Sequence, residues 1–144
     1  MIVRNILQRK GSEVISVAPD ISLHEMAKVL RENKIGAVLV LESDKRLVGV
    51  ISERDLVIAV AKHGGAVLES PVRDFMTEGV YTCSPDDDIK AVLEKMTARR
   101  IRHLPVVEDS NIVGIISIGD AVKHRIAETE AEAEALKAYI TTSR

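Results

Sequence analysis

Two serine–aspartate pairs are the residues of this chain whose types and spacing best suit chemistry. Ser52-x-x-Asp55 and Ser117-x-x-Asp120 each follow a short apolar run that a glycine opens. The pattern predicts a strand, a turn and a helix start, where free N–H groups can bind an anion and the carboxylate can accept two hydrogen bonds from a ribose diol. The same spacing is typical of a capping box, in which the side chains only satisfy backbone groups. Both interpretations stay open for each motif taken alone.

Both motifs belong to a longer pattern that occurs twice in the chain. Pro19 and Pro85 hold equivalent places in the two copies, as do Gly49 and Gly114. Each copy predicts a β-α-β-β-α unit: a β-branched segment, an amphipathic helix, two strands joined by a polar turn, and a second helix. The expected strands are 14–17, 37–41 and 47–52 in the first copy, and 80–83, 103–107 and 112–117 in the second.

A lead-in segment is duplicated as well, because residues 3–7 resemble residues 72–76, and each is expected to form a short helix. We therefore expect three segments, which are listed here in order: 1–70 as the first repeat with its N-terminal lead-in helix, 71–125 as the second repeat, and 126–144 as a C-terminal helical tail. The tail is rich in glutamate and alanine, which favour a helix. We interpret it either as a solvated helix or as a contact with a second protomer.

Composition excludes several classes of protein. The chain has 144 residues, is 46% hydrophobic and 29% charged, and so is expected to be a soluble globular protein. Its net charge of −2 gives no support to nucleic-acid binding. Cys83 is the single cysteine, which excludes an internal disulfide or multi-cysteine metal site and favours a cytoplasmic location. No apolar run approaches the roughly 18 residues that span a bilayer, so no membrane association is expected.

The sequence also lacks the residues that most enzyme classes need. It contains no glycine-rich dinucleotide fingerprint, no Walker-type loop and no His-Glu-x-x-His motif. Asp55 and Asp120 have no second group in sequence that would separate acid from base roles. We therefore expect a protein that is not an enzyme and has no catalytic or metal-binding residues.

The order and spacing of these motifs resemble the tandem cystathionine-beta-synthase (CBS) domain pair, or Bateman module. The resemblance covers nearly all of residues 1–125. It rests on Val-x-Ser/Thr-Val/Cys-x-Pro at the start of each unit, Ile-x-x-Leu/Val-Pro/Leu-Val at the second strand, and Gly-x-Ile-Ser-x-x-Asp at the third. The duplication of all three motifs in the same order makes the resemblance specific.

The resemblance implies an α/β (α+β) fold of two tandem β-α-β-β-α units packed as a pseudo-two-fold pair. It also implies a regulatory sensor that binds an adenosine nucleotide and signals to an effector protein, as yet unknown. AMP is the expected ligand, with ADP, ATP or NAD(H) as alternatives, and no metal is required. A homodimer is expected, because pairs in this family commonly bury their apolar helix surface against a second pair. The alternative is a dimerisation or interaction scaffold without a physiological ligand.

Two clefts are implied, each drawing on both repeats. Small residues at 36 and 37 leave room for a flat base in the first cleft, and an arginine at 102 suits a phosphate. The first, preferred cleft would contain Ser16, Val17, Pro19, Ile35, Gly36, Ala37, Arg102, His103, Ser117, Gly119 and Asp120. The second, weaker cleft would contain Thr82, Cys83, Pro85, Ile101, Pro105, Ser52, Arg54 and Asp55. Bulkier residues replace the small pair there, so we expect the second cleft to be closed or to take a different ligand.

Overall fold

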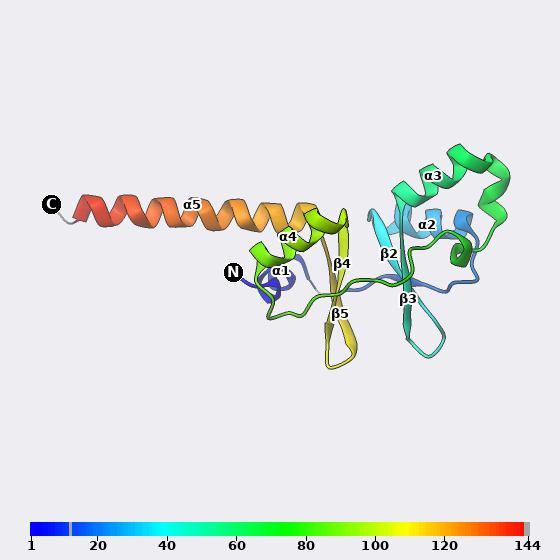
Figure 1. The fold of residues 1–144 in the computed structure, drawn as a ribbon, viewed down its shortest axis with the longest axis horizontal. Helices are drawn as coiled ribbons and strands as arrows, with labels where there is room; N and C mark the ends of the chain where they lie inside the picture. The colour runs from blue at the N-terminus through cyan, green and yellow to red at the C-terminus, as the bar shows by residue number, and fades with distance from the viewer. Residues whose placement is uncertain (12, 143–144) are drawn as a thin grey trace. The chain divides into compact units, whose positions relative to one another are not determined.

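The computed structural model describes residues 1–11 and 13–142 as a mixed α/β fold, which confirms the predicted fold class. The chain divides into two compact units. The middle unit is Val14–Tyr81. The outer unit joins the segment that ends at Glu13 to the part of the chain that begins at Thr82. Figure 1 labels most of the helices and strands and colours the chain by residue number.

The middle unit is a three-stranded sheet covered by helices. Its elements are β1 (Ser16–Val17), α2 (Leu23–Asn33), β2 (Ala37–Leu41), β3 (Leu47–Ser52) and α3 (Glu53–His63), followed by 3₁₀ turns at Gly65–Glu69 and Val72–Asp74. Strand β2 lies in the centre, parallel to β1 and antiparallel to β3. Helix α2 begins where the Ser22 hydroxyl accepts a hydrogen bond from the Glu25 N–H at 3.1 Å, the bond that caps a helix N-terminus.

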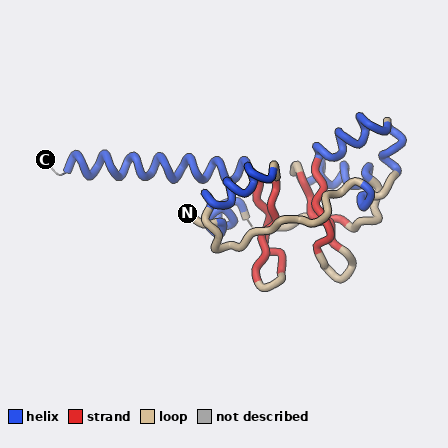
Figure 2. The backbone as a smooth tube through the Cα atoms, viewed as in Figure 1, coloured by secondary structure: helices blue, strands red, loops and turns tan. Residues whose placement is uncertain are grey.

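The outer unit is built on a two-stranded antiparallel hairpin. Its elements are α1 (Val3–Lys10), α4 (Ile89–Arg99), β4 (His103–Glu108), β5 (Asn111–Ser117) and α5 (Ile118–Thr142). The two hairpins, one in each unit, are the red segments joined by tight turns in Figure 2. Buried side chains from α1, α4, β4, β5 and α5 form a single apolar cluster, so α1 is part of this core.

The strand expected at 80–83 is reduced to a single bridge between Cys83 and Val106. In the middle unit, the Leu39 N–H donates to the Ile15 carbonyl and extends the pairing of the first strand. Pro105 occupies the place of Leu39 in the second repeat and has no N–H to donate. The pairing therefore ends after one residue, as is typical of a proline on the edge of a sheet.

Helix α5 is longer than the sequence boundaries suggested. The second helix of the second repeat and the expected tail form one continuous helix, Ile118–Thr142. Residues 120–142 contain neither glycine nor proline, so no residue in this stretch ends the helix. A boundary at residue 125 or 126 is not visible as a break in the backbone.

The lead-in segments are exchanged between the repeats. Val3, Ile6 and Leu7 are buried in the core of the outer unit with the second repeat, whereas Val72 is buried in the core of the middle unit with the first. The compact units thus do not coincide with the boundary expected at 70 and 71, because each unit combines one repeat with the lead-in of the other.

Glycines in the interior of β3 and β5 explain how the lead-ins pack so closely. A Cβ atom added to Gly114 would lie 2.6 Å from Leu7 Cδ2, and one added to Gly49 would lie 2.7 Å from Met76 Sδ. Neither glycine has a positive φ angle, so closeness of packing, rather than backbone conformation, requires glycine at both positions.

Candidate functional site

The β3–α3 turn forms a complete capping box. The Asp55 N–H donates to Ser52 Oγ at 3.3 Å, and Asp55 Oδ2 accepts from the Ser52 N–H at 2.9 Å. The Ser52 hydroxyl also donates a hydrogen bond to the same carboxylate oxygen, at 3.1 Å. The N–H of Glu53, the first residue of α3, donates to the Gly36 carbonyl at 2.9 Å. The capping interpretation of this motif is therefore satisfied in the structure.

The β5–α5 turn repeats these bonds and adds a cation. The Asp120 N–H donates to Ser117 Oγ at 3.0 Å, and Asp120 Oδ2 accepts from the Ser117 N–H at 2.9 Å. Lys10, the last residue of α1, donates from Nζ to the same Oδ2 at 2.6 Å and to the Ile115 carbonyl at 2.8 Å. Among the described residues, every hydrogen bond to the Asp120 carboxylate goes to Oδ2, which leaves Oδ1 able to accept more.

The surroundings keep Asp120 ionised. Partial burial by itself would raise the pKa of this carboxyl, but the hydrogen bonds from Lys10 and from Ser117 outweigh it and hold the pKa below its ordinary value. The side chain is 29% exposed, so a ligand in solution can reach it. An ionised carboxylate at a helix start is the form that accepts hydrogen bonds from hydroxyl groups.

His124 lies one turn further along α5 and is 5% exposed. Its Nδ1 atom is buried and has no hydrogen-bond partner among the described residues. Burial, then the nearby Arg9 and Lys123, lower its pKa, against an opposing effect of Asp120. The imidazole is therefore neutral at pH 7 and adds no positive charge beside the Asp120 carboxylate.

Residues predicted for the first cleft fall into both units. In the outer unit, the register pairs His103 with Ser117, and the Arg102 carbonyl accepts the Ile118 N–H at 2.8 Å, so these residues adjoin the Asp120 turn. The middle-unit residues separate into two groups. Ser16, Val17 and Pro19 line one pocket of about 440 Å³, and Ile35 and Gly36 line another of about 440 Å³. The two groups line separate pockets of the middle unit, although β1 pairs with β2 next to both.

Residues predicted for the second cleft are divided in the same way. Ser52, Arg54 and Asp55 lie in the middle unit, where the register places Ser52 opposite Ala37. The remaining residues lie in the outer unit and are listed together: Thr82, Cys83, Pro85, Ile101 and Pro105. Burial raises the pKa of the Cys83 thiol to about 12, with a smaller contribution from Asp87, so this cysteine is not a thiolate nucleophile at neutral pH.

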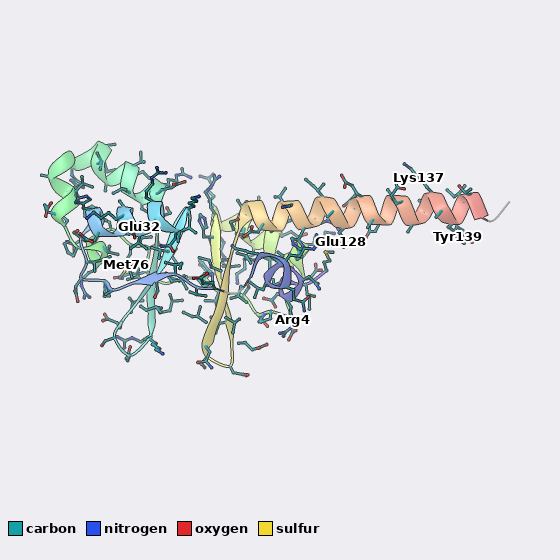
Figure 3. All side chains as sticks on the ribbon, turned by 180° about the vertical axis from the view of Figure 1, so that it is seen from behind. Arg4, Glu32, Met76, Glu128, Lys137 and Tyr139 are labelled. Atoms are coloured by element: carbon teal, nitrogen blue, oxygen red, sulfur yellow. The ribbon has the colours of Figure 1, made fainter. Side chains whose placement is uncertain are left out.

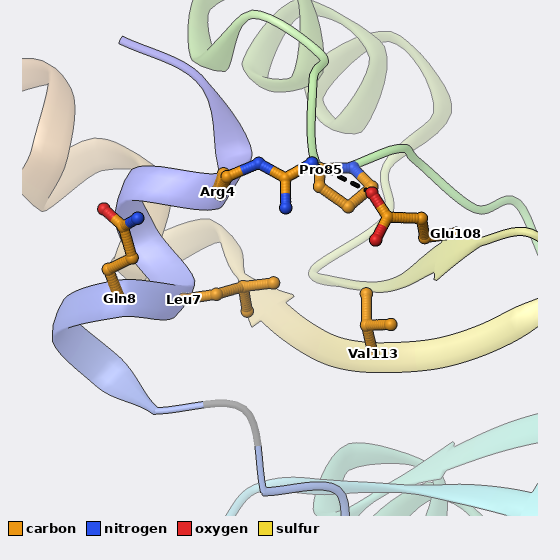
Figure 4. A pocket seen from close by; sticks show the side chains of 6 residues that line it. All are labelled: Arg4, Leu7, Gln8, Pro85, Glu108 and Val113. Carbon is orange, nitrogen blue, oxygen red and sulfur yellow. Dashed lines mark hydrogen bonds and ion pairs between the residues drawn. The ribbon is translucent and has the colours of Figure 1, made fainter.

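Pro85 lines a pocket of about 310 Å³ within the outer unit (Figure 4). Arg4 crosses this pocket and pairs with Glu108 at 2.9 Å and with Asp86 at 3.1 Å. Arg73 of the second lead-in makes the equivalent pairs in the middle unit, with Asp20 and Glu42 as its partners. This pocket therefore lies beside an ion-pair arrangement that holds a lead-in segment in each unit. The charge of its arginine, Arg4, is already neutralised by the two carboxylates.

Lys10 is the residue of this region that sequence reasoning missed. It lies more than a hundred positions from Asp120 and in the other sequence repeat, so no local motif connects the two. The available signal was the lead-in duplication: alignment of residues 3–7 with 72–76 places Gly79 opposite Lys10. That difference indicates that only one of the two aspartates receives a lysine from a lead-in.

Comparison with known proteins identifies the repeated unit. The model of the CBS domain family matches residues 3–62 and again residues 72–127. The chain belongs to the CBS domain family. The tandem CBS pair expected from the sequence is thereby confirmed.

Solved CBS proteins share the fold over most of the chain. A CBS-domain containing protein from Agrobacterium tumefaciens is 45% identical with a TM-score of 0.83, and the match covers 86% of this chain and 92% of that one. A CBS domain pair solved in complex with 5′-methylthioadenosine and S-adenosyl-L-methionine is 28% identical with a TM-score of 0.77, covering 89% and 98%. The mitochondrial CBS domain-containing protein CBSX3 of Arabidopsis thaliana is 29% identical, over 96% of this chain and 71% of its own.

Two further features bear on the site. No group of three or more histidine, cysteine, aspartate or glutamate side chains suited to a metal ion occurs in the described ranges, 1–11 and 13–142. Over the same ranges, no helix combines the length and apolar character needed to cross a membrane. The family and the Asp120 turn are therefore the observations from which a function can be argued.

Proposed function

We propose that this chain is a regulatory module that binds an adenosine-containing ligand, with AMP as the expected ligand, and transmits its presence to a protein partner without consuming it. ADP, ATP and NAD(H) are the alternatives. The Asp120 carboxylate carries the proposal, because its Oδ1 can accept from a ribose diol while Oδ2 stays bonded to Ser117 and Lys10. The buried, unpaired Cys83 suits a reducing, cytoplasmic setting.

Three observations support an anionic nucleoside ligand at this turn. Arg102 is exposed and its backbone adjoins the start of α5, where a phosphate could pair with the guanidinium. Lys10 adds a second cation directly at Asp120. The complex of a related CBS pair with two adenosine derivatives shows that this family includes adenosine-binding members. Neither catalytic residues nor a metal is part of the proposal.

The two cleft groupings stay predictions, and mutagenesis can test them residue by residue. If the first grouping is right, Gly36→Val and Asp120→Ala will each weaken AMP binding, because one removes space for the base and the other removes the ribose acceptor. The second grouping predicts a separate, weaker binding event that depends on Asp55. A single binding event that is unchanged by Gly36→Val would contradict the assignment of Gly36 to the base.

The direct test is to denature the purified protein and identify the released small molecules by mass spectrometry, followed by calorimetric titration with AMP, ADP, ATP and NADH. We expect an adenosine compound to be released or to bind with saturation. At about 100 times its dissociation constant, such a ligand would add roughly 2.7 kcal/mol to stability and raise the melting temperature. Prolonged incubation followed by chromatography should return the ligand intact, whereas a new product would contradict a purely regulatory role.

A scaffold is the second candidate function, and exposed apolar side chains favour it. Helix α3 exposes Val57 and Ile58 at 66% and 41%, and α5 exposes Val122 and Ile126 at 42% and 54%. Val57 and Val122 are equivalent residues of the two repeats, so the exposure is duplicated. Such side chains favour a homodimer. Light scattering at micromolar concentration tests this: a dimer that forms without any nucleotide supports the scaffold, and a monomer excludes it.

A further inference from the structure

The C-terminal half of α5 extends beyond the core of the outer unit as a single rod (Figure 1). Ala121 and His124 are buried against the core, but every residue from Thr129 to Thr141 is exposed. Figure 3 shows Glu128 where α5 passes the body of the outer unit, with Lys137 and Tyr139 further out on the rod. A helix whose residues are all exposed over more than three turns gains little stability from tertiary packing, so this arm calls for an additional stabilising contact.

A row of exposed and mostly apolar residues along α5 follows a heptad, with Tyr139, which is 70% exposed, beside the row. The residues of the row are separated by steps of alternately four and three residues, and in order they are Val122, Ile126, Thr129, Ala133, Leu136 and Ile140. Ile126, Leu136 and Ile140 are 54%, 60% and 51% exposed. Alternating three- and four-residue steps place side chains along one seam of a coiled coil, with 126, 133 and 140 as a positions and 122, 129 and 136 as d positions.

Charges beside this seam distinguish the two possible orientations. In a parallel pair of identical helices, g residues face the e residues of the next heptad in the partner. Arg125 would then face Glu130 of a second copy, and Glu132 would face Lys137 of that copy, so both contacts are attractive. In an antiparallel pair, Glu130 would face Glu130 of the second copy, and Glu132 would face Glu132 of that copy. Lys123 would face Lys137 of the second copy, so all of these contacts would be repulsive.

We propose that residues 122–141 of α5 form a parallel two-stranded coiled coil with a second copy of this chain. The contact goes beyond ligand binding and does not depend on it. Thr129 and Ala133 at the centre of the seam bury little apolar surface, so the coiled coil is weak by itself. Its role is to fix the relative orientation of two protomers, because only the parallel arrangement satisfies the charges on both sides of the seam.

Disulfide trapping in the full-length chain tests the orientation. Leu136→Cys places a thiol at a d position, where parallel helices bring the two copies within the Cα separation of about 6 Å that a disulfide needs. Ala131→Cys is the matched control, because residue 131 lies on the opposite face of the helix. We expect mild oxidation to convert Leu136→Cys to a covalent dimer and to leave Ala131→Cys and the wild type monomeric on a denaturing gel. Cys83 does not interfere, because its side chain is buried.

Two results would overturn the proposal. Equal cross-linking of Leu136→Cys and Ala131→Cys would show random collision. Failure of Leu136→Cys to cross-link with itself would exclude the parallel seam, and cross-linking of Leu136→Cys with Ile126→Cys in a mixture would indicate the antiparallel pair instead.

A charge swap distinguishes contacts between copies from contacts within one helix. In the Leu136→Cys background, Glu132→Lys would face Lys137 of the second copy, and we expect cross-linking to slow by about five- to tenfold. Adding Lys137→Glu should restore the rate, because the pair between copies is attractive again. Lys137 also pairs with Glu134 of its own helix at 3.6 Å, and the double variant leaves that pair repulsive. Failure of the rescue would mean that the effect arises within one helix and would contradict the proposed seam.

Discussion

The two Ser-x-x-Asp turns have the same internal bonds and different surroundings. In both, the serine hydroxyl accepts the aspartate N–H and the aspartate accepts the serine N–H. Among the residues that the structure describes, Asp120 also receives a lysine, from the end of α1, and Asp55 does not. The motif therefore determines the cap, and the exchanged lead-in segment determines whether the cap is part of a charged site.

Neighbouring strands increase the difference. Beside the Ser52 turn lies the small pair Gly36 and Ala37, whereas Arg102 and His103 lie beside the Ser117 turn. The Ser117 turn, with its arginine and lysine, suits an anionic group of a ligand. The Ser52 turn, with its small residues, suits a flat apolar group. Duplication has preserved one backbone arrangement with two kinds of chemistry around it.

The largest expected effect is on ligand affinity. Asp120→Ala removes an ionised acceptor worth about 1.5–3 kcal/mol, so AMP affinity should fall by roughly tenfold or more. Asp55→Ala removes the same capping bonds without a lysine partner and should weaken AMP binding much less. Calorimetric titration of both variants measures the difference. Equal stability losses with unchanged affinity in both would leave capping as the only role, and a larger affinity loss in Asp55→Ala would reverse the assignment.

The next effect concerns the two glycines under the lead-ins. Gly49→Ala should destabilise the fold by about 2 kcal/mol and Gly114→Ala by about 1 kcal/mol, as overpacking commonly does. The added Cβ at 49 would meet the Thr77 carbonyl at 3.0 Å as well as Met76, and backbone cannot yield, whereas at 114 the three nearest atoms all belong to the Leu7 side chain. Urea denaturation measures both.

Gly65→Ala is the control for the glycine variants, because an added Cβ there meets no atom within 4 Å and the φ angle is not positive. It should be neutral or slightly stabilising. If Gly114→Ala proved more costly than Gly49→Ala, the backbone contact at Thr77 would not be the deciding factor.

Much of the fold can be predicted from the sequence because the pattern of each helix and strand occurs twice, once in each repeat. The ranges expected for β2 and β3 agree with the structure at both ends, since each is a continuous apolar run and a polar turn separates the two. The strand expected at 80–83 was wrong in extent, because the effect of Pro105 lies in the partner strand and acts through a missing hydrogen bond. A local sequence pattern predicts the position of a strand well, but it predicts the hydrogen bonds of that strand to its neighbour less well.

The site was less predictable than the fold. Ser117 and Asp120 form the expected turn, and Arg102 and His103 adjoin it. The lysine at Asp120 could not be inferred from either motif, because the exchange of lead-in segments is a long-range packing choice. The choice is whether Leu7 packs on the strand of its own repeat or on that of the other repeat. Both strands have a glycine at the equivalent position, Gly49 and Gly114, so the sequence does not decide between them.

A smaller effect tests the role of Lys10 in the contrast between the turns. Because the folded-state pKa of Asp120 is lowered, its ionisation contributes stability above the unfolded pKa of about 3.9, and this contribution is lost as the pH falls through the folded value. Lys10→Met should cost about 0.5–1 kcal/mol at pH 7, since the pair is partly exposed, and progressively less below about pH 4. Thermal unfolding from pH 2 to pH 7 measures this dependence. Lys62→Met, in the last turn of α3, should show a pH-independent effect, and the same profile in both variants would mean that Lys10 acts without Asp120.

The smallest expected effect concerns the arginines that attach the two lead-ins. Arg4 makes two short ion pairs, whereas Arg73 makes a short pair with Asp20 at 2.6 Å and a longer one with Glu42 at 3.8 Å. Both guanidinium groups are solvent-accessible, and exposed pairs contribute little and are screened by salt. Arg4→Met should therefore lower the melting temperature slightly more than Arg73→Met at low ionic strength. The loss of melting temperature in each variant should disappear in about 1 M salt, where the screening length falls to about 3 Å. A loss that persists in salt would instead indicate that the aliphatic part of the side chain packs against the lead-in, and an equal loss from both would mean that the second carboxylate partner contributes nothing.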